Sequence, residues 1–108
     1  MLKPALIAAL LCAAAAPAMA TDVSVSMSGI GRMNCAHWQS TPQLRAEGTV
    51  WIHGFWTGLN YVAAASEQSQ ADIDAASIIS EVDKTCAKRP SQLLASAVWA
   101  TFVDLVKK

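Results

Sequence analysis

Two cysteines that lie 51 residues apart, Cys35 and Cys86, place the strongest constraint on the fold of this chain. The third cysteine, Cys12, lies in an apolar leader that we expect to be removed, so a single pairing remains. A disulfide persists in the oxidising compartment that an exported protein enters. In the chain-entropy account, closing a loop of this length contributes about 4 kcal/mol, a large share of a small domain's stability.

The beginning of the chain has the pattern of a secretory signal peptide. Lys3 precedes an apolar run over residues 5–16, and Ala18 and Ala20 are the small residues that a signal peptidase recognises. We therefore expect a cleaved signal peptide over residues 1–20 and a periplasmic mature protein. No stretch approaches the roughly 20 apolar residues needed to cross a bilayer, so we expect no membrane span.

An alternative interpretation makes Cys12 a lipidated cysteine that would anchor the mature chain to a membrane. Lipoprotein signals have a small residue directly before that cysteine, whereas Leu11 stands there. A peptidase site also follows downstream, which favours cleavage after Ala20.

The charge of the predicted mature chain excludes a surface for polyanions. Residues 21–108 carry seven lysines and arginines against eight aspartates and glutamates, so the net charge is close to −1. Nucleic-acid binding requires a basic patch that neutralises phosphates, and anionic membranes attract basic segments. We therefore expect no nucleic-acid partner.

The predicted mature chain begins with an arm and a short helix. Residues 21–33 are rich in serine and glycine, which predicts a flexible N-terminal arm. Asn34 is a suitable N-cap for a short helix that contains Cys35, His37 and Trp38.

Three longer helices are expected after this point. Pro42 suits a first helical turn, and the helix that it begins should extend to Ala65, with apolar residues at helical spacing: Leu44, Trp51, Phe55, Gly58, Leu59 and Val62. After a polar loop over residues 66–71, the third helix should be capped either by Ser69, in a capping box that ends at Asp72, or by Asp72 itself, and should end near Lys88 and Arg89. A fourth helix should follow Pro90, beginning at Ser91. The fold class is therefore all-α, a small disulfide-linked bundle of about four helices in one domain over residues 34–108.

The residues that could bind a metal or perform catalysis do not form a recognisable site. Cys35, His37, His53 and Cys86 are zinc ligand types, but only the first two are close in sequence, and oxidation would remove both thiolates. Cys35 and His37 are two apart on a helix and would not face each other as nucleophile and base. We therefore predict no metal, no cofactor and no enzymatic activity.

The segment from Trp51 to Tyr61 combines aromatic residues with two glycines. Gly54 and Gly58 lie four apart on one helix face, and each costs about 1 kcal/mol relative to alanine, which suggests close packing against another helix. We expect Trp51 and Phe55 to fill the core and Trp56 or Tyr61 to remain outside it.

The order of these features resembles the HdeA/HdeB family of periplasmic acid-stress chaperones and their small secreted relatives. The resemblance extends from about Asn34 to Leu105 and depends on these features in order: Cys35 with Trp38, the Trp51-x-x-Gly54-Phe55-x-x-Gly58-x-Asn60 segment, Ile78 to Val82, Cys86-x-x-x-Pro90 and Ala97. The Tai-type immunity proteins are a second similar group, because they are also exported, helical and disulfide-bonded.

The chaperone resemblance implies a folded, usually dimeric protein at neutral pH that binds unfolded periplasmic proteins once acid loosens it. Full protonation would bring the mature chain to about +10, and the resulting self-repulsion favours opening. The candidates for contact with clients or a dimer mate are apolar residues of two helices: Trp51, Phe55, Trp56, Leu59, Trp99 and Phe102. The alternatives are a Tai-type immunity or inhibitor protein with one specific partner and a structural accessory protein without a client.

Overall fold

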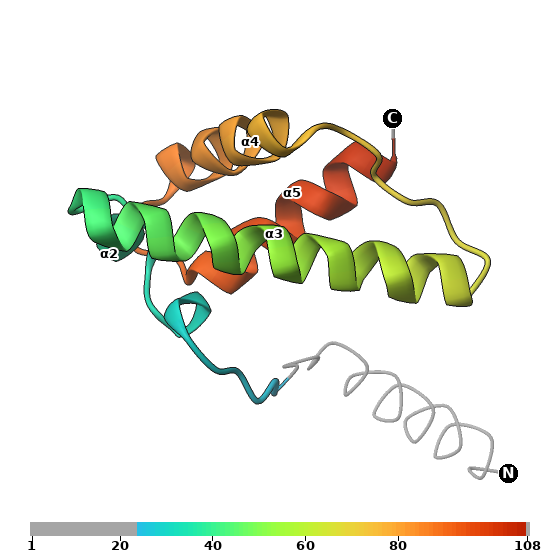
Figure 1. Cartoon of the computed structure of the whole chain (residues 1–108), viewed down its shortest axis with the longest axis horizontal. Helices are drawn as coiled ribbons and strands as arrows, with labels where there is room; N and C mark the ends of the chain where they lie inside the picture. Colours follow the sequence, from blue (N-terminus) through green and yellow to red (C-terminus); the bar gives the residue numbers. More distant parts are fainter. Residues whose placement is uncertain (1–23, 108) are drawn as a thin grey trace, which may run out of the picture.

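The computed structural model describes residues 24–107, and this part of the chain is helical without a β-strand (Figure 1). A 3-10 helix, η2 (Ile30–Arg32), precedes the four helices α2 (Cys35–Trp38), α3 (Pro42–Ala65), α4 (Ala75–Lys88) and α5 (Leu94–Val106). The all-α class and the four helices expected after residue 34 are confirmed. The predicted signal peptide lies outside the described residues.

Side-chain caps explain where the first two α-helices begin. The Asn34 Oδ1 atom accepts a hydrogen bond from the His37 amide at 2.8 Å, and the Thr41 Oγ1 atom accepts one from the Leu44 amide at 3.1 Å. Each bond satisfies an amide that has no partner within its own helix. With Pro42 in its first turn, α3 has the bounds that the sequence predicted.

The helix α4 begins later than either predicted cap would place it, because the preceding chain is held against α3. The Asn60 side chain accepts a bond from the Ala71 amide at 2.9 Å and donates one to the Ala71 carbonyl at 3.1 Å. The Trp56 indole donates to the same carbonyl at 3.0 Å. Asp74, and not Asp72, is then the N-cap, since its Oδ1 atom accepts from the Ser77 amide at 2.8 Å.

The start of α5 is also displaced, from Ser91 to Leu94, by bonds to a distant segment. The Gln92 carbonyl accepts a hydrogen bond from the Cys35 amide at 2.9 Å, and the Leu94 amide donates to the Met33 carbonyl at 2.8 Å. Because backbone groups of this segment bond to residues 33–35, residues 91–93 do not form a turn of α5.

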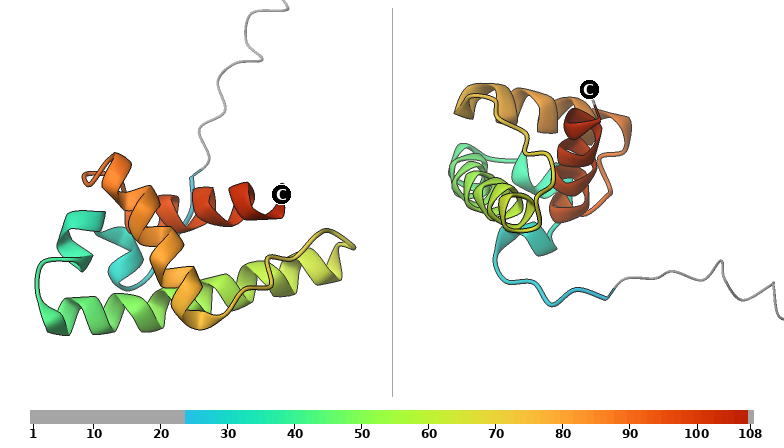
Figure 2. Two further views of the ribbon diagram at one scale, coloured as in Figure 1. Left: turned by 90° about the horizontal axis from the view of Figure 1, so that it is seen from above. Right: turned by 90° about the vertical axis from the view of Figure 1, so that its right-hand side faces the viewer.

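The core lies where α4, α5 and η2 meet the inner side of α3, which forms one side of the bundle (Figure 2). Its largest members are at most 7% exposed: Ile30, Trp38, Ile52, Trp56, Ile78, Val82, Leu94, Val98 and Phe102. The Trp56 ring meets Phe102 edge to face, with centroids 5.3 Å apart. Of the two side chains expected as alternatives outside the core, Tyr61 is exposed and Trp56 is buried.

The buried face of α3 differs from the predicted stripe. Ile52 and Trp56 form its centre, Trp51, Phe55 and Leu59 are only partly buried, and Val62 is 62% exposed. No Asp, Glu, Lys or Arg occurs between residues 48 and 66, so polarity does not distinguish the inner face of this helix from the outer one.

The end of the predicted flexible arm is packed onto the bundle, which corrects that prediction for residues 28–33. Ile30 is 4% exposed, and the Trp51 indole donates a hydrogen bond to the Ser28 carbonyl at 2.9 Å. Gly31 is also buried, and the Trp51 ring occupies the space that a side chain there would need. A glycine is therefore required at residue 31 for close approach of the aromatic ring.

Gly48 lies directly against the Trp38 ring, and replacing this glycine should destabilise the fold. In Gly48→Ala, the new Cβ atom would collide with the indole ring, whose Nε1 atom would lie only 2.7 Å away. The ring is fully buried and bonded to the Arg45 carbonyl at 3.0 Å, so it cannot yield freely. We expect a loss of about 1–3 kcal/mol in the free energy of unfolding, measured by urea denaturation at pH 7.

Glu47, the exposed residue directly before Gly48, provides the control for this substitution. Glu47→Ala should change the free energy of unfolding by less than about 0.5 kcal/mol. Equal stability of the Gly48→Ala chain and the unmodified chain would contradict the close contact.

Candidate functional site

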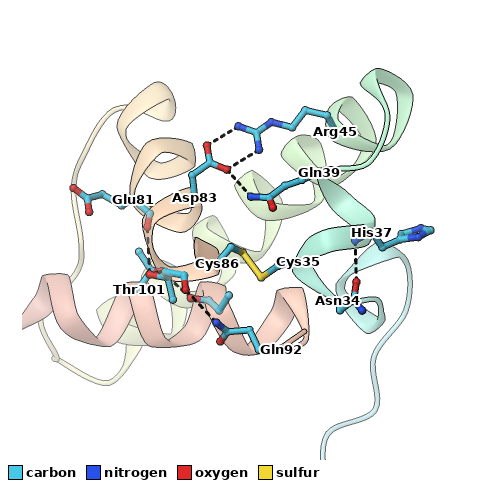
Figure 3. Close-up of a disulfide and its surroundings, with 12 residues drawn as sticks. Asn34, Cys35, His37, Gln39, Arg45, Glu81, Asp83, Cys86, Gln92 and Thr101 are labelled. Atoms are coloured by element: carbon cyan, nitrogen blue, oxygen red, sulfur yellow. Dashed lines mark hydrogen bonds and ion pairs between the residues drawn. A yellow bond between two sulfur atoms is a disulfide. The ribbon is translucent and has the colours of Figure 1, made fainter. Parts of the chain in front are cut away.

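The predicted disulfide is present and joins α2 to α4 (Figure 3). Cys35 is the first residue of α2, Cys86 lies in the last turn of α4, and their Cα atoms are 5.6 Å apart. Both residues are fully buried, so the bond is shielded from solvent thiols. The pairing inferred from the cysteine count is therefore confirmed.

Backbone hydrogen bonds extend this connection between α2 and α4 to the turn before α5. The Ala36 amide donates to the Pro90 carbonyl at 3.0 Å, beside the bond from the Cys35 amide to Gln92. The Gln92 side chain in turn donates to the Thr85 carbonyl of α4 at 3.1 Å. The N-terminus of α2 is thus satisfied by the turn between α4 and α5, and the disulfide is enclosed in a hydrogen-bonded connection.

A charged cluster holds α3 to α4 next to the disulfide. The two terminal nitrogens of Arg45 donate to the two carboxylate oxygens of Asp83, each at 2.6 Å, and Gln39 donates to the same carboxylate at 3.1 Å (Figure 3). The Arg45 guanidinium also lies over the Trp38 ring, 4.1 Å from its centroid. We call Gln39, Arg45 and Asp83 the clasp.

The clasp favours the charged form of both partners. Hydrogen bonds from Arg45, and a weaker contribution from Gln39, hold the pKa of Asp83 below its usual range. The bond to Asp83 raises the pKa of Arg45. A lowered carboxyl pKa contributes stability above the unfolded-state value, near pH 4, and this stability is lost as pH falls through the folded-state value. Because the side chains are 37% and 36% exposed, solvent screening limits the contribution to about 1 kcal/mol.

The six predicted contact residues are divided between the core and the surface. Trp56 and Phe102 are buried, while Trp51, Phe55 and Leu59 are partly buried and pack on the core. Among the six, only Trp99 is largely exposed, at 53% of its surface, and it stacks on Phe102 with centroids 6.4 Å apart.

The close packing predicted for Gly54 and Gly58 is wrong within one chain. A Cβ atom added at either glycine would meet no other part of the described chain within 4 Å. The glycines that do receive a neighbouring ring are Gly31 and Gly48. The spacing of the glycines could not identify the packed ones, because tertiary packing decides which side of α3 faces the core.

The two histidines do not assemble a metal site. The His53 Nε2 atom lies 3.0 Å from the Ala75 carbonyl at the start of α4, whereas the His37 amide participates in the Asn34 cap. Within residues 24–107, no three His, Cys, Asp or Glu side chains gather as possible metal ligands. Over the same residues, no helix has both the length and the apolar character to cross a membrane.

No protein-family model, curated protein or solved structure matches this chain. The clasp was not foreseen, because Arg45 and Asp83 are 38 residues apart and each is unremarkable in its own helix. The only advance signal was their opposite charge on helices expected to be neighbours.

Removing the disulfide should lower stability more than removing any one contact. For a chain carrying both Cys35→Ala and Cys86→Ala, we expect a loss of about 4 kcal/mol in the free energy of unfolding, because the unfolded chain regains its loop entropy. Urea denaturation at pH 7 measures the loss, and the unmodified protein with reductant in the urea should behave similarly. An unchanged midpoint would show that the bond does not stabilise the fold.

Asp83→Asn should destabilise the protein in a pH-dependent way. At pH 7 we expect a loss of about 1 kcal/mol, since the bidentate ion pair is removed. At pH 3 the difference from the unmodified chain should shrink, because acid weakens the pair there too. Glu81→Gln is the control, as Glu81 pairs only with Lys84, at 3.3 Å, on an exposed surface. A difference of the same size at both pH values would argue against the charge-based role of the clasp.

Proposed function

We propose that this protein is a non-enzymatic periplasmic chaperone of the HdeA/HdeB type, which binds unfolded proteins when acid opens its helical bundle. The observation that carries the proposal is the position of the clasp beside the disulfide. Asp83 and Cys86 lie three residues apart on α4, one held by a titratable ion pair and the other by a covalent bond. Acid would break the first connection and leave the second.

A second acid-sensitive contact lies at the other end of α4. Hydrogen bonds from Ser77, first from its amide and then from its hydroxyl, lower the pKa of the N-cap Asp74. As for Asp83, the stabilisation exists above the unfolded-state pKa and is lost as pH falls through the folded-state value. Protonation therefore weakens both the start of α4 and its connection to α3, while the mature chain approaches a net charge of about +10.

The surface beneath α4 would supply the contacts for clients. Ile78 and Val82 are the buried residues of its inner face, and Ile52 and Trp56 belong to the same core on α3. Loosening α4 would uncover apolar area of the kind that unfolded proteins bind. The disulfide would limit the expansion, so the uncovered surface stays presented on a compact chain.

Suppression of client aggregation tests this proposal. We expect the mature protein to reduce light scattering by an acid-denatured client at about pH 2–3 and not at pH 7, with a matching change in tryptophan fluorescence. Asp83→Asn should shift both transitions to higher pH, because one of the acid-sensitive contacts is already absent. Glu81→Gln should leave them in place. Equal protection at both pH values, or none at either, would contradict the acid-activated function.

A specific immunity or inhibitor function is the second candidate, and the exposed aromatic surface of α5 favours it. Trp99 is 53% exposed in the closed fold, and Met33 and Leu93, at 44% and 38%, are joined to the start of the same helix. A rigid exposed tryptophan is a typical anchor for one protein partner. This function would give a one-to-one complex at pH 7 that Trp99→Ala weakens, without protection of clients in acid.

A further inference from the structure

The connection between α3 and α4 is the longest between helices in the part of the chain that the structure describes. It extends from Ser66 to Asp74 and arches from the far end of α3 back to α4 (Figure 1). Residues 66–70 are all exposed, and Ala71, which Asn60 and Trp56 hold, is the first buried residue after α3. We call residues 66–70 the exposed loop.

The middle of the exposed loop is not hydrogen-bonded. The Gln68 amide still donates to the Ala63 carbonyl of α3 at 2.7 Å, and the next amide with a partner is that of Ala71. Within residues 24–107, neither Ser69 nor Gln70 forms a hydrogen bond through its backbone or its side chain. An endoprotease binds its substrate as an extended strand, so this stretch can enter an active site with little local unfolding.

The other connections between the α-helices are held by hydrogen bonds. In the turn between α4 and α5, the carbonyls of Pro90 and Gln92 accept bonds from the first amides of α2. In the short connection between α2 and α3, the Ser40 amide donates to the His37 carbonyl at 3.2 Å, and Thr41 caps α3. A protease would have to break these bonds before it could bind either segment, so cleavage between the α-helices is favoured in the exposed loop.

The disulfide connects the two sides of the exposed loop, because Cys35 precedes the loop and Cys86 follows it. A cut at Gln68–Ser69 or Ser69–Gln70 would separate η2, α2 and α3 from α4 and α5 in sequence, but the sulfur–sulfur bond would still join the two pieces. The clasp also connects the pieces, and the core contains residues of both. A cut in the exposed loop therefore leaves the contacts of the bundle in place.

We propose that the exposed loop is a proteolytic processing site, at which an endoprotease converts the chain into two pieces that the disulfide keeps in one folded protein. In this hydrolysis the peptide C–N bond breaks, the carbonyl carbon takes the hydroxyl of a water molecule, and the nitrogen takes its hydrogen. The side chains at the two bonds are uncharged, so the enzyme would be one that accepts small and neutral polar residues. This inference goes beyond the proposed chaperone function and does not depend on it.

Limited digestion of the oxidised mature protein with subtilisin, a protease of broad specificity, tests the site at pH 7. Mass spectrometry should show a product that is one water molecule heavier than the intact chain. Reductant should then separate this product into two pieces whose masses place the cut at Gln68–Ser69 or Ser69–Gln70. Circular dichroism of the cut, oxidised protein should retain the helical signal of the uncut protein. A first cut inside a helix, pieces that separate without reductant, or loss of the helical signal would overturn the proposal.

Trypsin, which cleaves after lysine and arginine, provides a matched comparison of two exposed positions. Ser69→Arg places a trypsin site in the exposed loop, and Ser80→Arg places the same residue on an exposed face of α4. We expect cleavage at residue 69 to be at least about tenfold faster than at residue 80, because a helix must unfold locally before a protease can bind it. Equal rates of cleavage at the two introduced sites would contradict the special accessibility of the exposed loop.

Discussion

The disulfide between Cys35 and Cys86 is the constraint on which the remaining contacts depend. The helix α2 has only four residues and could not persist alone, because one turn does not offset the cost of nucleation. Its attachment to α4 holds Trp38 in the core, and the buried ring then fixes Arg45 through a backbone bond and a cation–π contact. The arginine held in this way presents both terminal nitrogens to Asp83.

Local chemistry made part of this structure predictable from the sequence. The N-cap of α2, the start of α3 at Pro42 and the single cysteine pairing depend on residues close in sequence or on counting, and they agree with the structure. The starts of α4 and α5 differ from the prediction because hydrogen bonds to distant residues hold the chain before each helix in a non-helical conformation. The inner face of α3 was not predictable, since its apolar residues surround the helix and the choice between faces is made by tertiary packing.

Charged side chains are unevenly distributed between α3 and α4. Titratable contacts gather on α4, where Asp74 caps the helix and Asp83 joins it to α3. On α3, residues 48–66 include no Asp, Glu, Lys or Arg, and the exposed carboxylate of this helix, Glu47, lies near its beginning. The charged contacts that connect the helices therefore involve α4 and the first turns of α3.

Asn60 gives the chain before α4 an attachment that acid cannot remove. The Asn60 side-chain amide forms hydrogen bonds with both the N–H and the C=O group of Ala71, and neither residue has an acidic or basic side chain. With Cys86 fixed near the opposite end, α4 is tethered at two points that survive protonation. These two attachments therefore limit how far α4 can move away from α3 and α2 when its titratable contacts are lost.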